Sequence, residues 1–278
     1  MRRTDVAIVG GGQAGLAMSF HLSAAGIDHV ILERGDVAER WRGERRESLR
    51  LLTPNWMTRL PGWSYRGAEP DGFMTAAETI GFLEGYARAT GAPVARDTAV
   101  RSVHAVAGGY RIRTSRGDLD AKAVVVATGD CGVPHVPPLA SALPASVAQL
   151  VPARYRAPDA LPDGGVLVVG ASASGVQIAD ELARAGRSVI LAAGRHVRIP
   201  RRHRGRDIMA WLDAAGILDE RPGDVPDPEA VRRQPSFQLV GTREGRTLDL
   251  STLAEGGVRL AGRLAAVDGR SVRFADDL

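Results

Sequence analysis

Several residue types are scarce in this chain, and each scarcity excludes a class of function. Its 278 residues include one cysteine, Cys131, which excludes an intramolecular disulfide, a CxxC redox pair and a cysteine-based zinc site. A low cysteine number is also typical of a reducing compartment. No apolar run reaches the roughly 20 residues needed to span a bilayer. Gly10, Gly11 and Gly12 interrupt the N-terminal stretch that could be read as a signal peptide. We therefore expect a cytoplasmic protein with no membrane partner.

Positive charge comes almost entirely from arginine, because Lys122 is the only lysine among 36 basic residues. A net charge of +4 would suit a nucleic-acid ligand. An arginine bias combined with abundant alanine and glycine is, however, what a GC-rich genome produces. The arginine-rich loop that follows residue 195 also lacks the interleaved aromatic residues on which single-stranded nucleic acids stack. We expect no nucleic-acid partner.

The chain has the composition of a globular protein, with 44% apolar and 24% charged residues. Its length is sufficient for about two domains. Two segments share one pattern of strand, glycine-rich turn, helix and strand. The first runs over residues 5–33 and the second over residues 166–195. Each has the size of a βαβ unit, and the short Val/Ile runs suit parallel strands covered on both faces. We predict an α/β fold with two Rossmann-like dinucleotide-binding domains of the three-layer ββα type.

The segments outside these two units are also patterned. A helix is predicted over residues 75–90, with Thr75 and Glu78 spaced as a capping box. Residues 99–117 alternate like antiparallel strands around a turn at Gly108-Gly109, and residues 123–129 read as a buried strand. The stretch 132–164 is rich in proline and alanine, as linkers are. Residues 207–216 have a helical pattern, residues 219–235 read as a loop, and the C-terminal segment predicts a hairpin with its turn at Asp268-Gly269.

The first turn, GGGQAG, has the spacing that a dinucleotide pyrophosphate requires. Gly10 permits the tight turn, Gly12 lets the pyrophosphate approach the backbone, and Gly15 lets the helix pack on the strand. The N–H groups at the start of the helix, including those of Gln13 and Ala14, would face the phosphates. Glu33 ends the second strand, where a carboxylate can accept hydrogen bonds from ribose hydroxyls. The alternative is a glycine-rich packing turn with no ligand.

The second turn begins at Gly170 and ends at Gly175, with Ser172 in place of the middle glycine. The hydroxyls of Ser172 and Ser174 could still bond a phosphate. At the end of the following strand stands Arg195 instead of an acid, and arginine can bind a 2′-phosphate through two hydrogen bonds. One such contact gives roughly ten- to hundredfold preference for NADPH over NADH. Arginine recurs over the next eleven residues, where Arg201 is a further candidate; the alternative is a solvated basic loop.

An acid after the first turn and an arginine after the second suggest FAD in the first domain and NADPH in the second. A further resemblance rests on the motifs VAIVGGGQAGL, AERWR (38–42), SLRLLTP (48–54), VVVATG, VVGASASG and PRRHRGRDIMAWLDAAG (200–216). With them, the chain resembles the flavin-containing monooxygenase-like flavoproteins, and is similar to bacterial members described as flavoproteins of the potassium-transport type. This resemblance covers essentially the whole chain.

The resemblance implies an organisation and a set of cofactor contacts. An FAD domain over residues 1–140 is followed by a linker over 141–164 and an NADPH domain over 165–278, which interrupts the FAD domain. Arg40 and Trp41 would flank the flavin, although Trp41 could equally be a packing anchor. The other implied contacts with FAD are Arg34, Thr53, Thr128 and Gly129.

The function that follows is transfer of a hydride from NADPH to FAD, and then of electrons to O₂ or to a small-molecule substrate. The cofactors carry this chemistry, so we assign no catalytic side chain and no metal site. The sequence departs from the family in two ways. The signature Phe-x-Gly-x-x-x-His-Ser/Thr-x-x-Tyr keeps only Tyr155, and we expect the C-terminal return of the FAD domain to be missing. A truncated, non-catalytic remnant that binds dinucleotides is therefore the alternative.

Overall fold

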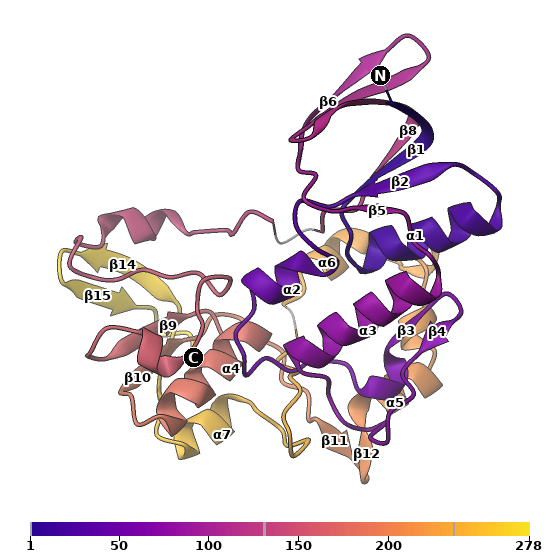
Figure 1. Ribbon diagram of the computed structural model, residues 1–278. Coiled ribbons are helices and arrows are strands. Elements are labelled where there is room, and N and C mark those ends of the chain that lie inside the picture. Colours follow the sequence, from indigo (N-terminus) through magenta and orange to yellow (C-terminus); the bar gives the residue numbers. More distant parts are fainter. Residues whose placement is uncertain (1, 130–131, 236) are drawn as a thin grey trace. The chain divides into compact units, whose positions relative to one another are not determined.

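The computed structural model describes residues 2–129, 132–235 and 237–278, which form two compact units (Figure 1). Cys131 lies outside these residues. The first unit combines Met1–Arg45, Thr58–Arg66 and Thr75–Pro134. The second combines Arg46–Met57, Gly67–Met74 and His135–Leu278.

A six-stranded sheet in the order β5-β2-β1-β8-β7-β6 organises the first unit. Parallel pairing joins β5, β2, β1 and β8, whereas β8, β7 and β6 pair antiparallel. The strand predicted over residues 123–129 forms the second half of β8. It is not buried as predicted, since Val124 and Val125 are half-buried and Val126 is 75% exposed. β8 is also longer than expected because its first half completes a hairpin with β7. The strands are β1 (Arg2–Val9), β2 (His29–Leu32), β5 (Val94–Ala95), β6 (Val100–Val106), β7 (Gly109–Thr114) and β8 (Gly117–Val126).

Helices α1 (Gln13–Ala24) and α3 (Ala76–Ala89) lie side by side on one face of this sheet (Figure 1). Leu16 of α1 and Tyr86 of α3 pack with Ile8 and Ile31 of the sheet in one buried cluster. The predicted capping box of α3 is present, with Thr75 and Glu78 each bonding the other's backbone N–H. A short helix, α2 (Glu39–Gly43), and a strand pair, β3 (Arg59–Leu60) with β4 (Trp63–Ser64), complete the unit.

The second unit is built on a parallel three-stranded sheet in the order β13-β10-β9. Helix α4 (Ala173–Arg184) joins β9 (Val166–Val169) to β10 (Val189–Ala192), and β13 (Arg259–Ala261) follows α7 (Leu250–Glu255). Its buried core includes Val176, Leu182, Leu191 and Leu253. The smaller elements are β11 (Arg202–His203), β12 (Arg206–Asp207), α5 (Ile208–Ala214), α6 (Pro228–Arg232) and the 3₁₀ turns Asn55–Met57, Pro138–Ala142, Pro158–Ala160, Ile217–Asp219 and Pro222–Asp224.

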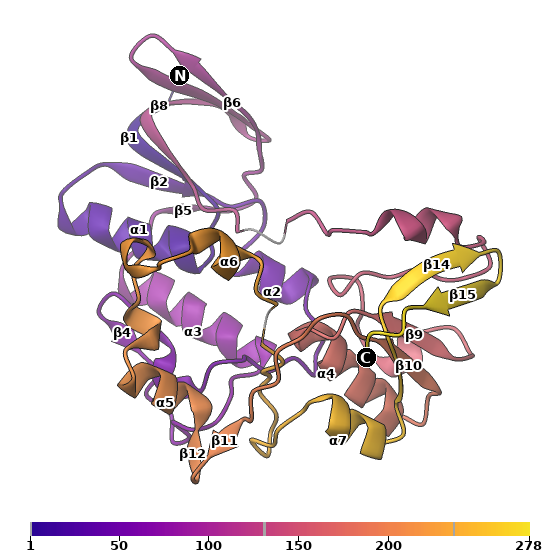
Figure 2. The same ribbon diagram turned by 180° about the vertical axis from the view of Figure 1, so that it is seen from behind.

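The C-terminal hairpin of this unit differs from its prediction by one residue. It consists of β14 (Leu264–Asp268) and β15 (Ser271–Phe274), which form a two-stranded ribbon of their own (Figure 2). Asp268 pairs with Ser271, so the turn is Gly269-Arg270. The predicted loop over residues 219–235 also contains α6. The α/β class and both strand–turn–helix–strand units are confirmed, whereas the domain limits at residues 140 and 164 stay a prediction.

Candidate functional site

The first glycine turn connects β1 to α1 and is too tight for side chains at two positions. Gly10 adopts φ of +113°, and its N–H donates to the Leu32 carbonyl at 2.9 Å. A Cβ on Gly15 would lie 2.0 Å from the carbonyl oxygen of Gly10. A Cβ on Gly12 would instead meet no atom within 4 Å. The turn therefore needs glycine at positions 10 and 15 for its own fold, while Gly12 leaves open space in front of the backbone.

The start of α1 is prepared for an anion. Gly12 is the N-cap and provides no side-chain hydrogen bond, and the first turn of the helix contains no acidic residue. Gln13 and Ala14 are exposed. The first N–H groups of a helix lack partners within it and carry the positive end of its dipole. A phosphate could therefore bind here without displacing a protein group.

Glu33 lies against this turn, as the sequence predicts, but it has an additional structural task. Its Oε2 accepts the N–H of Gly11 at 2.6 Å, and the residue is 7% exposed. The N–H of Ala38, which adopts a left-handed φ of 62°, donates to the Gly11 carbonyl at 3.3 Å. Glu33 thus accepts the N–H of Gly11, and Ala38 donates to its carbonyl, so both backbone polar groups of this turn residue are held. The role of Ala38 has no signal in the sequence.

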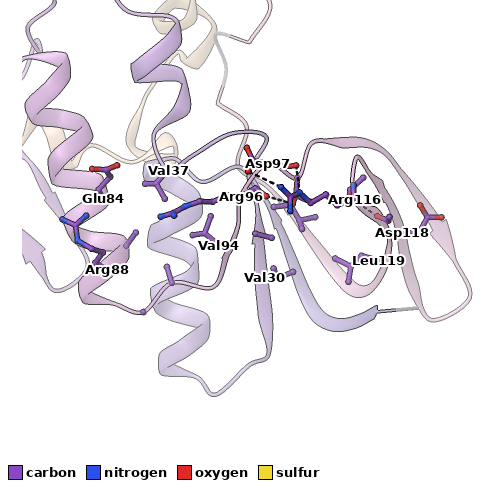
Figure 3. A pocket seen from close by; sticks show the side chains of 18 residues that line it. Val30, Val37, Glu84, Arg88, Val94, Arg96, Asp97, Arg116, Asp118 and Leu119 are labelled. Atoms are coloured by element: carbon purple, nitrogen blue, oxygen red, sulfur yellow. Dashed lines mark hydrogen bonds and ion pairs between the residues drawn. The ribbon is translucent and has the colours of Figure 1, made fainter.

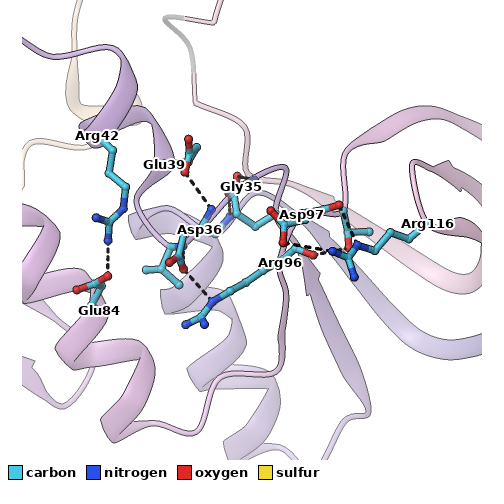
Figure 4. A network of polar contacts seen from close by, with 12 residues as sticks. Gly35, Asp36, Glu39, Arg42, Glu84, Arg96, Asp97 and Arg116 are labelled. Atoms are coloured by element: carbon cyan, nitrogen blue, oxygen red, sulfur yellow. Dashed lines mark hydrogen bonds and ion pairs between the residues drawn. The ribbon is translucent and has the colours of Figure 1, made fainter.

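A polar network fixes the backbone that carries Glu33 (Figure 4). The N–H of Thr98 donates to the Glu33 carbonyl at 2.7 Å, and the N–H of Asp97 donates to the Gly35 carbonyl at 3.0 Å. Two ion pairs flank this contact, Arg96 with Asp36 at 2.8 Å and Arg116 with Asp97 at 3.2 Å. These exposed pairs contribute little energy individually. Together with the backbone bonds they hold the end of β2 in place.

Thr128 and Gly129 follow β8 and lie at the same edge of the sheet as the first turn. A Cβ on Gly10 would be 2.5 Å from the carbonyl oxygen of Ala127, the residue before Thr128. Arg40 reaches the same place, since its Nη1 donates to the Thr128 carbonyl at 3.4 Å. The structure thus brings Arg40, Thr128 and Gly129 together next to the glycine turn.

Arg34 and Arg40 share one carboxylate, that of Glu44, at 2.6 Å and 2.8 Å. Burial raises the pKa of Glu44, but the hydrogen bonds and charges of the two arginines outweigh this and hold its pKa below the ordinary value. Trp41 lies under the guanidinium of Arg45, 5.3 Å from it, and packs against the core of the unit. This contact favours the packing-anchor interpretation of Trp41. Thr53 belongs to the second unit, and its predicted contact stays a prediction.

The first unit also contains a cavity of about 750 Å³ that is lined by residues of β2, β5, β7, β8 and α3 (Figure 3). Apolar side chains such as Val30, Val94 and Leu119 form part of its wall, and charged groups such as Arg88 and Asp118 line it as well. Within the part of the chain that the structure describes, none of the residues predicted to bind a cofactor lines this cavity. It is separate from the glycine turn.

The second glycine turn repeats the geometry of the first. Gly170 adopts φ of +102°, its N–H donates to the Ala192 carbonyl at 2.9 Å, and a Cβ on Gly175 would lie 1.8 Å from the Gly170 oxygen. Ser172 is the N-cap of α4, yet its side chain makes no capping hydrogen bond. Ser172 and Ser174 are both exposed. Their hydroxyls are therefore accessible to a ligand at the helix start.

The arginines that follow β10 do not act as one group. Arg195 is exposed, three residues after the end of the strand. Arg198 instead pairs with Asp249 at 2.5 Å. Burial raises the pKa of Asp249, but the Thr252 N–H and the Arg198 guanidinium outweigh it and hold the pKa below its ordinary value. Arg198 is thus committed to an ionised carboxylate that caps α7.

Arg201 is the most deeply buried of these arginines, with 1% of its surface exposed. Its guanidinium donates to both carboxylate oxygens of Asp207, at 2.8 and 2.7 Å, and to the Leu52 carbonyl at 2.7 Å. It also lies 4.4 Å from the centre of the Phe73 ring. This place favours a structural role for Arg201 over the predicted contact with a cofactor. No pattern in the sequence around Arg201 indicates this role, because Leu52 and Phe73 lie more than 120 residues earlier.

Tyr155, the residue retained from the monooxygenase signature, is a core residue of the second unit. Its hydroxyl donates to Glu181 of α4 at 3.1 Å. Burial, reinforced by the Glu181 charge, raises its pKa above the ordinary value. A tyrosine in this place stays protonated and braces α4.

Among the described residues, no three His, Cys, Asp or Glu side chains are grouped to hold a metal ion. None of the helices in the described ranges is both long and apolar enough to cross a membrane.

Comparisons with known proteins agree on a family. The family model described as pyridine nucleotide-disulphide oxidoreductase matches residues 7–214. The chain is 33% identical over 276 residues to an oxidoreductase of Geobacillus kaustophilus called CzcO-like, covering 98% of this chain and 76% of that protein.

Solved structures show the same fold. A mutant flavin monooxygenase from Stenotrophomonas maltophilia superposes with a TM-score of 0.73 at 22% identity, over 100% of this chain and 75% of that one. OTEMO in complex with FAD and NADP superposes with a TM-score of 0.58 at 18% identity, over 87% of this chain and 53% of that one.

Proposed function

This chain belongs to the pyridine nucleotide-disulphide oxidoreductase family, and from this premise we propose that it is an FAD-dependent oxidoreductase that oxidises NADPH. One observation carries the proposal. The chain contains two glycine turns of matching geometry, the first next to Glu33 and the second followed by Arg195. The likeness to OTEMO, whose structure contains FAD and NADP, supports this choice of cofactors.

The first unit would hold FAD. The open space in front of Gly12 and the uncapped start of α1 fit a pyrophosphate. Glu33, at the end of β2, fits a ribose because its carboxylate oxygens have lone pairs beyond those that accept the N–H groups of Gly11 and Gly35. We propose that these groups bind the adenosine diphosphate part of FAD. Neighbouring segments of the same unit would bind the remainder of the FAD molecule. The proposed contacts in this unit are Gly10, Gly12, Gln13, Ala14, Gly15, Glu33, Arg34, Arg40, Trp41, Thr128 and Gly129.

The second unit would hold NADPH. Gly170 and Gly175 shape its turn, and the exposed residues Ser172 and Ser174 lie at the helix start where a pyrophosphate would bind. Arg195 is exposed at the carboxyl end of β10, the end at which ligands bind in open parallel sheets. We leave Arg201 out of this site because its guanidinium is engaged by Asp207 and Leu52.

The chemistry that FAD supplies when bound is acceptance of a hydride from NADPH and delivery of electrons to O₂ or to a small-molecule substrate. The residues of this chain would bind and orient the two nucleotides. We further propose that the FAD-binding part spans residues 1–140, the NADPH-binding part spans residues 165–278, and residues 141–164 link them. A redox-active cysteine pair within the chain is excluded, because Cys131 is the only cysteine.

The second candidate function is binding of dinucleotides without catalysis of hydride transfer. The loss of the monooxygenase signature favours it, since Val151 and Pro152 stand where that signature has His and Ser/Thr. The visible absorption spectrum of the purified protein separates the candidates at the first step. We expect a yellow protein, or one that becomes yellow and stays so when incubated with FAD and desalted. A colourless protein that retains no added FAD would contradict the proposed function.

Arg195→Ser tests the choice of NADPH. Loss of a charge-assisted contact with the 2′-phosphate is expected to weaken NADP⁺ binding by roughly ten- to hundredfold. NAD⁺ lacks that phosphate, so its affinity should not change. Titration calorimetry with both nucleotides measures the ratio, and Arg202→Ser, which replaces an exposed arginine of the nearby strand β11, is the matched control. Equal losses for NADP⁺ and NAD⁺ would remove Arg195 from the 2′-phosphate site.

A further inference from the structure

Gln238 reaches the second glycine turn from a distant part of the chain. The residue is 2% exposed, and its Nε2 donates to the carbonyl of Ala171 at 3.0 Å. Its own N–H donates to the Val197 carbonyl at 3.0 Å. The residue is therefore fixed beside the segment that follows β10, with its buried side-chain amide bonded to the turn.

In the first glycine turn, the carbonyl at the equivalent position is held by a different donor. Gly10 corresponds to Gly170 and Gly15 to Gly175, so Gly11 corresponds to Ala171. The Gly11 carbonyl accepts the backbone N–H of Ala38 at 3.3 Å. Both turns thus bond the carbonyl of their second residue to a donor from another segment. The first turn uses a main-chain donor and the second uses a side chain.

Holding this carbonyl also sets the direction of the next N–H. In a trans peptide unit the C=O and the N–H point in opposite directions within one plane. Because the Ala171 oxygen is bonded to the buried amide of Gln238, the N–H of Ser172 points away from that amide. Ser172 is the N-cap of α4, so its N–H belongs to the anion-binding start of that helix. If the peptide unit rotated, it would present a carbonyl oxygen to a phosphate.

The other half of the Gln238 amide gives a second indication. Its Oε1 is buried and has no hydrogen-bond partner among the residues that the structure describes. A buried, half-satisfied amide is costly compared with an apolar side chain of the same shape. Stability alone therefore does not account for glutamine at this position, whereas the restraint of the turn does.

We propose that Gln238 is a positioning residue for the second dinucleotide site, which it serves by fixing the Ala171–Ser172 peptide unit so that the Ser172 N–H faces the pyrophosphate. The inference rests on the proposed binding of NADPH by this turn. It does not require Gln238 to touch the ligand. Because the effect acts on the pyrophosphate end, it applies equally to NADP⁺ and NAD⁺, in contrast to the effect of Arg195.

Gln238→Met provides the test, because methionine has a similar length and shape but cannot donate a hydrogen bond. We expect the dissociation constants of NADP⁺ and NAD⁺ to rise together by about tenfold. The FAD dissociation constant should stay unchanged, and the Tm should stay within about 3 °C of the wild type, since one hydrogen bond and one unpaired oxygen are lost together. Gln234→Met, which replaces an exposed glutamine nearby, is the matched control and should match the wild type throughout.

Gln238→Asn keeps the amide group on a side chain that is one methylene shorter. It should show the same selective loss of NADP⁺ and NAD⁺ affinity. This second variant controls for a folding defect that is specific to methionine. Unchanged NADP⁺ binding in both variants would overturn the inference while leaving the proposed function intact. Parallel losses of NADP⁺ binding, FAD binding and Tm would also overturn it, because they indicate a purely structural role. Failure of the wild-type protein itself to bind NADP⁺ or NAD⁺ would contradict the proposed function and the inference together.

Discussion

Replacing Arg201 with methionine is expected to lower the free energy of unfolding by about 3–5 kcal/mol, the cost of removing one member of a buried ion pair. The loss is large because Asp207 would keep its charge without its bidentate partner, and the Leu52 carbonyl would lose its donor. Loss of the contact with the Phe73 ring adds to it. Chemical denaturation gives the difference, and a fall in Tm of roughly 10 °C should accompany it.

Arg202→Met is the control for this prediction, because Arg202 is the exposed neighbour and its replacement should change stability by less than about 0.5 kcal/mol. A double-mutant cycle with Asp207→Asn should give a coupling energy of about 1–3 kcal/mol. The structural role of Arg201 would be wrong if the two methionine variants were equally stable. It would also be wrong if Arg201→Met weakened NADP⁺ binding at unchanged stability.

The two glycine turns can be disabled one at a time. In Gly15→Ala, the added Cβ would lie 2.0 Å from the Gly10 oxygen, and in Gly175→Ala it would lie 1.8 Å from the Gly170 oxygen. Neither contact is possible, so each turn must distort. Since displacement of a binding group by about 1 Å can cost on the order of a hundredfold, Gly15→Ala should lose about a hundredfold in FAD affinity and Gly175→Ala about the same in NADP⁺ affinity.

Each variant should keep the ligand of the other turn, which makes the pair its own control against general unfolding. Gly81→Ala is a further control, because its Cβ would meet no atom within 4 Å on helix α3, and a helical glycine-to-alanine change stabilises by about 0.5–1 kcal/mol. Fluorescence titration with FAD and calorimetry with NADP⁺ measure the two affinities. If Gly15→Ala bound FAD normally, the first turn would not be the FAD site.

Local features of this molecule could be predicted from the sequence because their determinants are close together in the chain. The turn glycines, the capping box at Thr75 and the position of Glu33 beside its turn all follow from spacing within one βαβ unit or one helix. Each involves residues within about one supersecondary unit, where chain geometry restricts the possible arrangements.

The features that could not be predicted depend on segments far apart in the chain. The arginines after β10 form one charged run in the sequence, yet Asp207 and Asp249 engage two of them and leave Arg195 exposed. Gln238 acts on a turn 67 residues away. Nothing in the sequence near Ala171 indicates which distant donor its carbonyl accepts, because tertiary packing alone brings the two together.

The most direct test of the central claim is anaerobic mixing of the FAD-loaded protein with NADPH while the visible flavin absorption is followed. We predict that the flavin band bleaches, and that NADH bleaches it roughly ten- to hundredfold less efficiently because it lacks the group that Arg195 would bind. A protein that holds FAD but shows no bleaching with NADPH would contradict hydride transfer between two nucleotides bound by this chain.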